Sequence, residues 1–287
     1  RMKREQVKES SYAAYAFQVE RHLLPRFGES IYIKEECVQA YVGQCLEHGA
    51  SVATVRDRVG ILRMMVRYAS RRGWMRCEEW DIRYVGRRLP PKVPVLSSGH
   101  QSLLLRHVRQ HASARNLGLY ICLAAGLRIG EVCGLQWADI DTEHGLVHIR
   151  RTVERIYCTE GGRGRTRVVC STPKTAHSWR VIPVGAELSA MAGRVRGEAP
   201  DDCYVLTGTP HPAEPRTYRA YFNGLMRRLG IPAIRFHALR HSFATRCIEN
   251  NCDSKTVSEI LGHANVGITL NLYTHPGLAQ KRRCIES

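Results

Sequence analysis

The sequence has no apolar run of the roughly 20 residues that a membrane-spanning helix needs, and its N-terminus has no signal-peptide core. It also has no C-x-x-C pair, and because its 11 cysteines are odd in number they cannot all pair within one chain. The closest two, Cys247 and Cys252, have no second pair or histidine cluster at zinc-finger spacing. We therefore expect free thiols and a soluble protein of the cytoplasm, without a membrane partner.

Internal repeats and low-complexity tracts are missing as well, and acidic residues are few. The 287 residues include 43 Lys+Arg against 26 Asp+Glu, which gives a net charge of +17, and 44% of the chain is hydrophobic. This length and hydrophobic content can build more than one packed domain. The region 1–95 and the remainder are both net positive, so we expect a polyanion that the protein wraps, and nucleic acid fits best.

Apolar residues at helical spacing predict a helical domain over residues 1–86. Ser10 and Ser11 are expected to cap its first helix. The third helix has an apolar stripe and, on an adjacent face, arginines with little acidic compensation. Such a face is either solvated or laid along DNA phosphates, and we predict DNA contacts there. The arginines concerned are Arg56, Arg63, Arg67 and Arg71.

Residues 87–97 are predicted to be a basic linker, because the three prolines within this segment prevent helix continuation and favour extended backbone. Arg87, Arg88 and Lys92 are expected to follow the DNA backbone. A second domain over 98–287 begins with helical patterns, changes to short strands and hairpins between Leu146 and Val184, and returns to helix after Tyr218. The fold class is therefore mainly α with a small β-sheet and hairpin region.

Several residues whose side chains could take part in catalysis are spread along this second domain. Seen alone, each fits an ordinary structural role, such as a surface salt bridge, a turn lysine or a packed tyrosine. In chain order they are Arg128 and Glu131 after Gly126-Leu127, Lys174 within Thr172-Pro173-Lys174-Thr175, His237-x-x-Arg240, His263 after Leu261-Gly262, and Tyr273.

This ordered set resembles the tyrosine recombinase (phage integrase) family, and within it the integrases of conjugative transposons. The family is marked by an arginine, a hairpin lysine, a His-x-x-Arg, a further His or Trp, and a nucleophilic tyrosine. The resemblance implies a helical core-binding domain followed by a mixed α/β catalytic domain. Ala125 and Val132 depart from residues common in relatives, but both lie beside the predicted catalytic positions.

The resemblance also implies a reaction, in which a tyrosine attacks a DNA phosphodiester and forms a 3′-phosphotyrosine without metal, ATP or other cofactor. Charge that develops on the nonbridging oxygens needs fixed cations, and the leaving 5′ oxygen needs an acid. The implied roles are Tyr273 as nucleophile, Arg128 and Arg240 on the phosphate, His237 and His263 in proton movement, Lys174 as acid, and Glu131 as support. Arg163, Arg165 and Arg167 of the same hairpin region remain alternative cations.

The predicted function is site-specific recombination of double-stranded DNA at the ends of a mobile element and at its target, in a bacterial nucleoid. A homo-oligomer, expected to be a tetramer, would exchange the tail 274–287 between protomers. A type IB topoisomerase and a non-catalytic DNA-binding regulator remain alternatives, whereas a metal nuclease lacks a tight acidic cluster. Because the chain begins with Arg1 and has no arm-binding domain, we expect a fragment of a longer protein.

Overall fold

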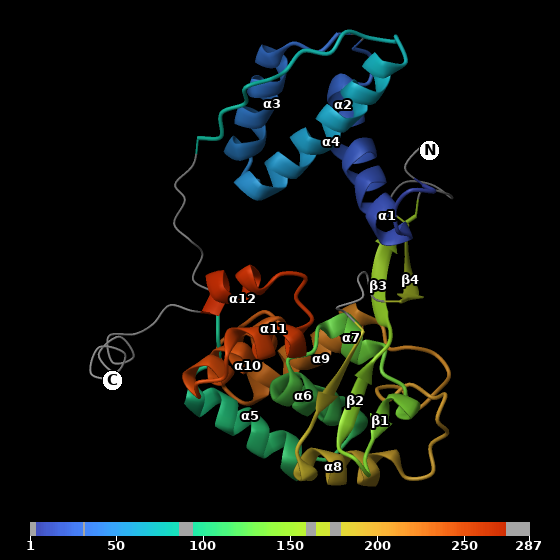
Figure 1. Ribbon diagram of the computed structural model, residues 1–287, viewed down its shortest axis with the longest axis vertical. Helices are drawn as coiled ribbons and strands as arrows, with labels where there is room; N and C mark the ends of the chain where they lie inside the picture. The colour runs from blue at the N-terminus through green and yellow to red at the C-terminus, as the bar shows by residue number, and fades with distance from the viewer. Residues whose placement is uncertain (1–3, 31, 86–93, 159–164, 173–178, 274–287) are drawn as a thin grey trace, which may run out of the picture. The chain divides into compact units, whose positions relative to one another are not determined.

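The computed structural model describes residues 4–30, 32–85, 94–158, 165–172 and 179–273 (Figure 1). The chain forms two compact units, one of Arg1–Pro91 with Ile156–Arg167 and the other of Lys92–Arg155 with Val168–Ser287. No helix in the described ranges is long and apolar enough to cross a membrane. The sequence did not indicate that the segment 156–167 groups with the first unit, and the domain boundaries at 86 and 97 stay a prediction.

The first unit is built from helices around a small apolar core. The stripe predicted for the third helix is confirmed, because Val55, Val59, Leu62 and Val66 are all buried. Ser51 caps this helix by accepting a hydrogen bond from the Thr54 N–H at 3.1 Å. The helices are α1 (Glu9–Gln18), the π-helical turn η1 (Val19–Leu23), α2 (Leu24–Phe27), α3 (Glu35–Glu47) and α4 (Val52–Arg71).

The cap predicted for the first helix is wrong. Helix α1 begins at Glu9, so Ser10 and Ser11 lie inside its first turn, and Lys8 takes the capping position, where its side chain does not cap the helix. The carboxylate of Glu9 lies in this first turn, where negative charge is favoured by the helix dipole. An acidic residue in the first turn therefore replaces a hydroxyl cap.

The second unit combines helices with two small antiparallel sheets. The helices are α5 (Ser98–Gln110), α6 (Ala114–Ala125), α7 (Ile129–Cys133), the 3-10 turn η2 (Trp137–Asp139), α8 (Ala186–Arg196), α9 (Pro215–Arg228), α10 (Ala238–Glu249), α11 (Ser254–Leu261) and α12 (Val266–Tyr273). Strands β1 (Ile140–Asp141), β2 (Leu146–Ile149) and β5 (Arg180–Pro183) form one sheet in the order β1-β2-β5, and β3 (Thr152–Tyr157) pairs with β4 (Thr166–Ser171). This confirms the predicted fold class.

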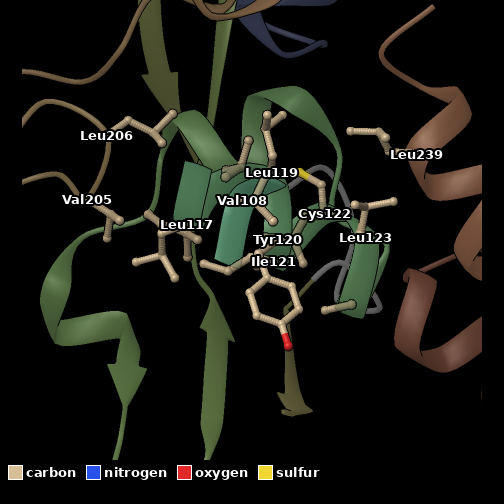
Figure 2. Close-up of a cluster of buried hydrophobic side chains, with 14 of the residues drawn as sticks. Val108, Leu117, Leu119, Tyr120, Ile121, Cys122, Leu123, Val205, Leu206 and Leu239 are labelled. Carbon is tan, nitrogen blue, oxygen red and sulfur yellow. The ribbon is translucent and has the colours of Figure 1, made fainter. Parts of the chain in front are cut away.

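Helix α6 is the centre of the second unit. Residues 116–123 of this helix are all buried, as is typical of a helix that packs on every side. Figure 2 shows its side chains near Val108 of α5, near Leu239 of α10, and near Val205 and Leu206 of the segment between α8 and α9. Helices α5, α8 and α10 pack around it. The helix ends at Gly126, whose left-handed backbone (φ 67°) turns the chain toward Arg128. A rigid buried helix therefore positions the first predicted catalytic residue.

Candidate active site

Arg128 and Glu131 are held together at the start of α7. The Arg128 N–H donates to Glu131 Oε2 at 2.8 Å, and Arg128 Nη1 donates to Oε1 at 2.7 Å. The first bond satisfies a backbone donor that the helix start leaves without an intrahelical partner. The Glu131 side chain is 5% exposed, whereas that of Arg128 is 37% exposed. The glutamate is thus a buried anchor, and the arginine reaches solvent.

A second arginine, Arg180, binds the same carboxylate. It begins strand β5 opposite Ile149, and strand alternation puts it on the same face as the buried Ile182. Its Nη1 lies 3.0 Å from Glu131 Oε1 and its Nη2 lies 2.9 Å from Oε2, which is the bidentate geometry that favours a strong pair. Its side chain is 6% exposed.

Arg240 supplies a third guanidinium from the first turn of α10. This residue is only 1% exposed, a rare state for an arginine that requires hydrogen-bond partners. Its Nη1 donates to the Gly126 carbonyl at 3.0 Å, so it also braces the turn that follows α6.

Three arginines that are far apart in the sequence converge on three consecutive carbonyls at the end of α11. Arg180 Nε donates to Ile260 O at 2.6 Å, Arg240 Nη2 donates to Leu261 O at 2.7 Å, and Arg128 Nη2 donates to Gly262 O at 3.1 Å. Carbonyls at a helix C-terminus lack intrahelical partners and carry partial negative charge. We call these carbonyls the α11 acceptor row, and the row gathers the cations at one place.

Two predicted histidines border these cations, and a third lies beside them. His237 precedes α10, and its ring meets the ring of His241 edge to face with centroids 4.5 Å apart. His263 follows Gly262, and its Nδ1 lies 2.8 Å from Thr269 Oγ1 on α12. Thr269 is buried, so this bond ties the loop after α11 to the helix that carries Tyr273.

Surrounding protein atoms and nearby positive charge lower the pKa of these three histidines, which are therefore neutral near pH 7. Burial, followed by the charges of Arg240 and Arg128, lowers the pKa of His263 to about 4. His237 is solvent-exposed, yet protein atoms around its ring and the neighbouring His241 and Arg240 lower its pKa. Burial and Arg240 also lower the pKa of His241. In the free protein these rings are hydrogen-bonding groups without charge.

Glu131 responds to the same charges in the opposite direction. Burial by itself would raise its pKa, but the hydrogen bonds and charge of Arg180, together with Arg128 and Arg240, lower it to about 2. The carboxylate is therefore ionised throughout the working range of pH.

The structure brings together five of the predicted catalytic residues, namely Arg128, Glu131, His237, Arg240 and His263. Lys174 lies outside the described residues. Tyr273 is the last residue of α12, and its side chain is also outside the description. The sequence analysis did not identify Arg180 as part of the site, nor the contact between the rings of His241 and His237.

The arginines predicted for DNA binding on α4 differ in their surroundings. Arg67 and Arg71 are exposed, and the Arg56 guanidinium lies 4.9 Å from the centroid of the Tyr84 ring. Arg63 is half-buried and donates to the Trp80 carbonyl at 2.7 Å, so it also supports the segment after α4. The remaining predicted contacts, Arg87, Arg88 and Lys92, lie outside the described residues.

The sequence profile of the phage integrase family matches residues 100–279, which include the acceptor row and all the predicted catalytic residues. The chain therefore belongs to the phage integrase family, and the predicted resemblance to tyrosine recombinases is confirmed.

Among individual relatives, a XerC-like tyrosine recombinase of Caldanaerobacter subterraneus subsp. tengcongensis is 29% identical over 89% of this chain and 70% of its own length. The transposase of transposon Tn916 from Enterococcus faecalis is also 29% identical, over 64% of this chain, and the match spans only 48% of that protein.

Solved structures share the fold. The Tn1549 transposon integrase in complex with circular intermediate DNA has a TM-score of 0.74 at 21% identity, covering 99% of this chain and 95% of that one. A lambda integrase dimer bound to a core site has a TM-score of 0.66 at 14% identity, covering 96% and 93%.

Proposed function

We propose that the protein is a site-specific DNA recombinase that cleaves and rejoins strands through Tyr273. The observation that carries this proposal is the convergence of Arg128, Arg180 and Arg240 on the α11 acceptor row, beside His237 and His263. Fixed, partly buried cations are what a phosphodiester needs when negative charge grows on its oxygens. The family membership of the chain supports the same chemistry.

In the proposed reaction the Tyr273 hydroxyl gives its proton to a neutral histidine, His237 or His263, while its oxygen attacks the scissile phosphorus and the bond to the 5′ oxygen breaks. Lys174 gives its proton to that oxygen, so a 5′-hydroxyl leaves and a 3′-phosphotyrosine remains. Arg128 and Arg240 hold the nonbridging oxygens. The neutral His237 and His263 donate hydrogen bonds, and a bound phosphate would raise their pKa and let them carry protons. A partner 5′-hydroxyl reverses the step.

The duplex is proposed to be held by the exposed arginines of α4 and by the basic segment that contains Arg87, Arg88 and Lys92. The similarity to the Tn916 transposase supports the end of a mobile element as substrate. Because recombination needs two paired sites, we propose a homotetramer on synapsed DNA at the bacterial nucleoid, with the tail 274–287 exchanged between protomers.

A covalent-adduct assay tests the proposal. Suicide DNA substrates made from candidate element ends are incubated with wild type, with Tyr273→Phe and with Tyr68→Phe as a matched control. We expect an adduct that resists denaturation for wild type and for the control, and none for Tyr273→Phe, which loses only the nucleophilic hydroxyl. DNA binding of the Tyr273→Phe variant should be unchanged.

The same samples separate the competing functions. Cleavage that disappears in excess EDTA and returns only with a divalent ion would favour a metal nuclease. Relaxation of supercoiled plasmids without paired sites would favour a type IB topoisomerase. An adduct of undiminished yield with Tyr273→Phe would remove this residue from the mechanism.

A further inference from the structure

Arg180 has a buried, charged side chain, and none of the proposed reaction steps gives it a contact with the substrate. It lies on β5, whose neighbouring Val181 is 51% exposed, while Arg180 turns inward with Ile182. Burying an arginine is costly unless its donors are satisfied, and here both ends of the fork bind Glu131 while Nε binds Ile260 O. The position therefore has a specific use for a guanidinium.

That use becomes clear from the Glu131 carboxylate. Oε1 accepts from Arg128 Nη1 and Arg180 Nη1, and Oε2 accepts from the Arg128 N–H and Arg180 Nη2. Each oxygen thus has one donor from Arg128 and one from Arg180. One carboxylate is shared by two guanidinium groups, of which only the Arg128 side chain is substantially exposed.

Charge counting shows what the sharing does. Without Arg180, Arg128 would remain hydrogen-bonded to Glu131, so the carboxylate would largely offset the charge of Arg128 in a partly buried site, where screening by water is weak. With Arg180 present, the pair of arginines exceeds the carboxylate by one positive charge. This surplus lies toward the exposed Arg128, which is the side from which an anion can approach.

We propose that Arg180 is a positioning residue that neutralises Glu131 and thereby leaves the charge of Arg128 available to the scissile phosphate. This inference rests on the proposed function, because it assumes a phosphodiester at Arg128. The competing explanation is a purely structural one, in which Arg180 only fastens β5 to the end of α11 through Ile260 O.

A double-mutant cycle separates the two explanations. Adduct formation by the 287-residue chain on a suicide substrate is measured for wild type, Arg180→Met, Glu131→Gln and the double variant. We expect Arg180→Met to slow adduct formation on the order of 10-fold to 100-fold. This loss should not exceed the rate loss caused by removing a residue that donates directly to the reacting phosphate. The double variant should recover at least about tenfold of that loss, because no carboxylate remains to neutralise Arg128.

Arg180→Lys serves as a second variant if Arg180→Met folds poorly, as judged by thermal unfolding of each protein. Lysine keeps the positive charge but loses the paired Nη donors of the guanidinium group, so the rate of adduct formation should lie closer to wild type than to Arg180→Met. A Lys variant as slow as Arg180→Met, or a double variant slower than both single variants, would overturn the proposal in favour of the structural explanation.

A substrate with a neutral methylphosphonate at the scissile position gives a readout that a structural role would not move. It carries no nonbridging charge, so the deficit of Arg180→Met relative to wild type should shrink on this substrate. An equal deficit on both substrates contradicts the proposal. If wild type itself forms no adduct on the phosphodiester, the proposed function fails instead, and the two failures are distinguishable.

Discussion

Positive charge at the candidate site is carried by guanidinium groups rather than by histidines. The lowered pKa values leave His237 and His263 neutral, so the cations of the described part of the site are Arg128, Arg180 and Arg240. Electrostatic attraction for a phosphate is therefore built in before DNA arrives, and it does not depend on a titrating group.

The lowered histidine pKa has a consequence for stability. A histidine that stays neutral in the folded protein down to about pH 4, but titrates near 6.5 when unfolded, makes the unfolded state bind protons first. The contribution of this histidine to the free energy of unfolding should thus be fully present above pH 6.5 and decrease as the pH falls toward 4. For His263 we expect a loss of about 1–3 kcal/mol.

Urea denaturation at a series of pH values measures this loss. His263→Asn keeps a polar side chain near Thr269 and should flatten the slope of the free energy of unfolding against pH between pH 6.5 and 4. His211→Asn, on an exposed loop, should leave this slope unchanged. An unchanged slope in His263→Asn would show that other groups cause the acid sensitivity. Glu131 acts in a separate window, because its pKa of about 2 makes its contribution fade only as pH falls below about 4.5.

At the residue scale, the sequence was most informative where the family motif is local. His237 and Arg240 lie three residues apart, so their common location follows from helix geometry. Arg180 had no such signal except its inward-facing place in a strand with Ile182, and its partner Glu131 is distant in the chain. Contacts that depend on β5 meeting α7 and α11 could not be predicted from spacing.

Among the elements, the turn between α6 and α7 makes the strictest demand on its sequence. Gly126 has φ 67°, and a Cβ there would lie 2.6 Å from Phe243 Cδ1 and 2.7 Å from Leu261 Cδ2. Both neighbours belong to helices that frame the site, so the turn has neither conformational nor spatial freedom for a side chain.

Gly126→Ala should therefore lower the free energy of unfolding by about 2–4 kcal/mol, the sum of left-handed strain and overpacking. Gly230→Ala is the matched control, because Gly230 has φ 65° but open space around its Cβ position. That control should cost only about 1 kcal/mol. Denaturant titration of both variants measures the difference, and equal losses would rule out the packing contribution.

Periodicity predicted the apolar stripe of α4 and the strands between residues 146 and 184. It missed α8, which is short and carries Gly193 in its interior. Hydroxyl-based capping failed at Ser10 because the choice among neighbouring start positions depends on backbone geometry and charge rather than on one residue type.

For the whole molecule, the charge of +17 predicts a steep salt dependence of DNA binding. Each phosphate neutralised contributes a slope of about −0.9 in log K against log salt. Replacing the exposed Arg67 and Arg71 by alanine should flatten the slope by about 2, with little change in adduct yield at saturating protein.

Fluorescence anisotropy at several salt concentrations gives these slopes. Lysine at the same two positions keeps the charge and is the matched control, which should retain the wild-type slope. If the alanine variant keeps that slope as well, this face of α4 is only solvated. Arg63 is unsuitable for the test, because its bond to the Trp80 carbonyl would mix stability with binding.

The α11 acceptor row also determines which kinds of mutation the protein can tolerate during evolution. Backbone carbonyls are present whatever side chain a residue carries, so substitutions at Ile260 or Leu261 leave the acceptors in place as long as the helix persists. A one-residue insertion within α11 would instead rotate the row by about 100° relative to the start of the helix and detach all three arginines together. The length of this helix is therefore under stricter constraint than the identity of the residues at its end.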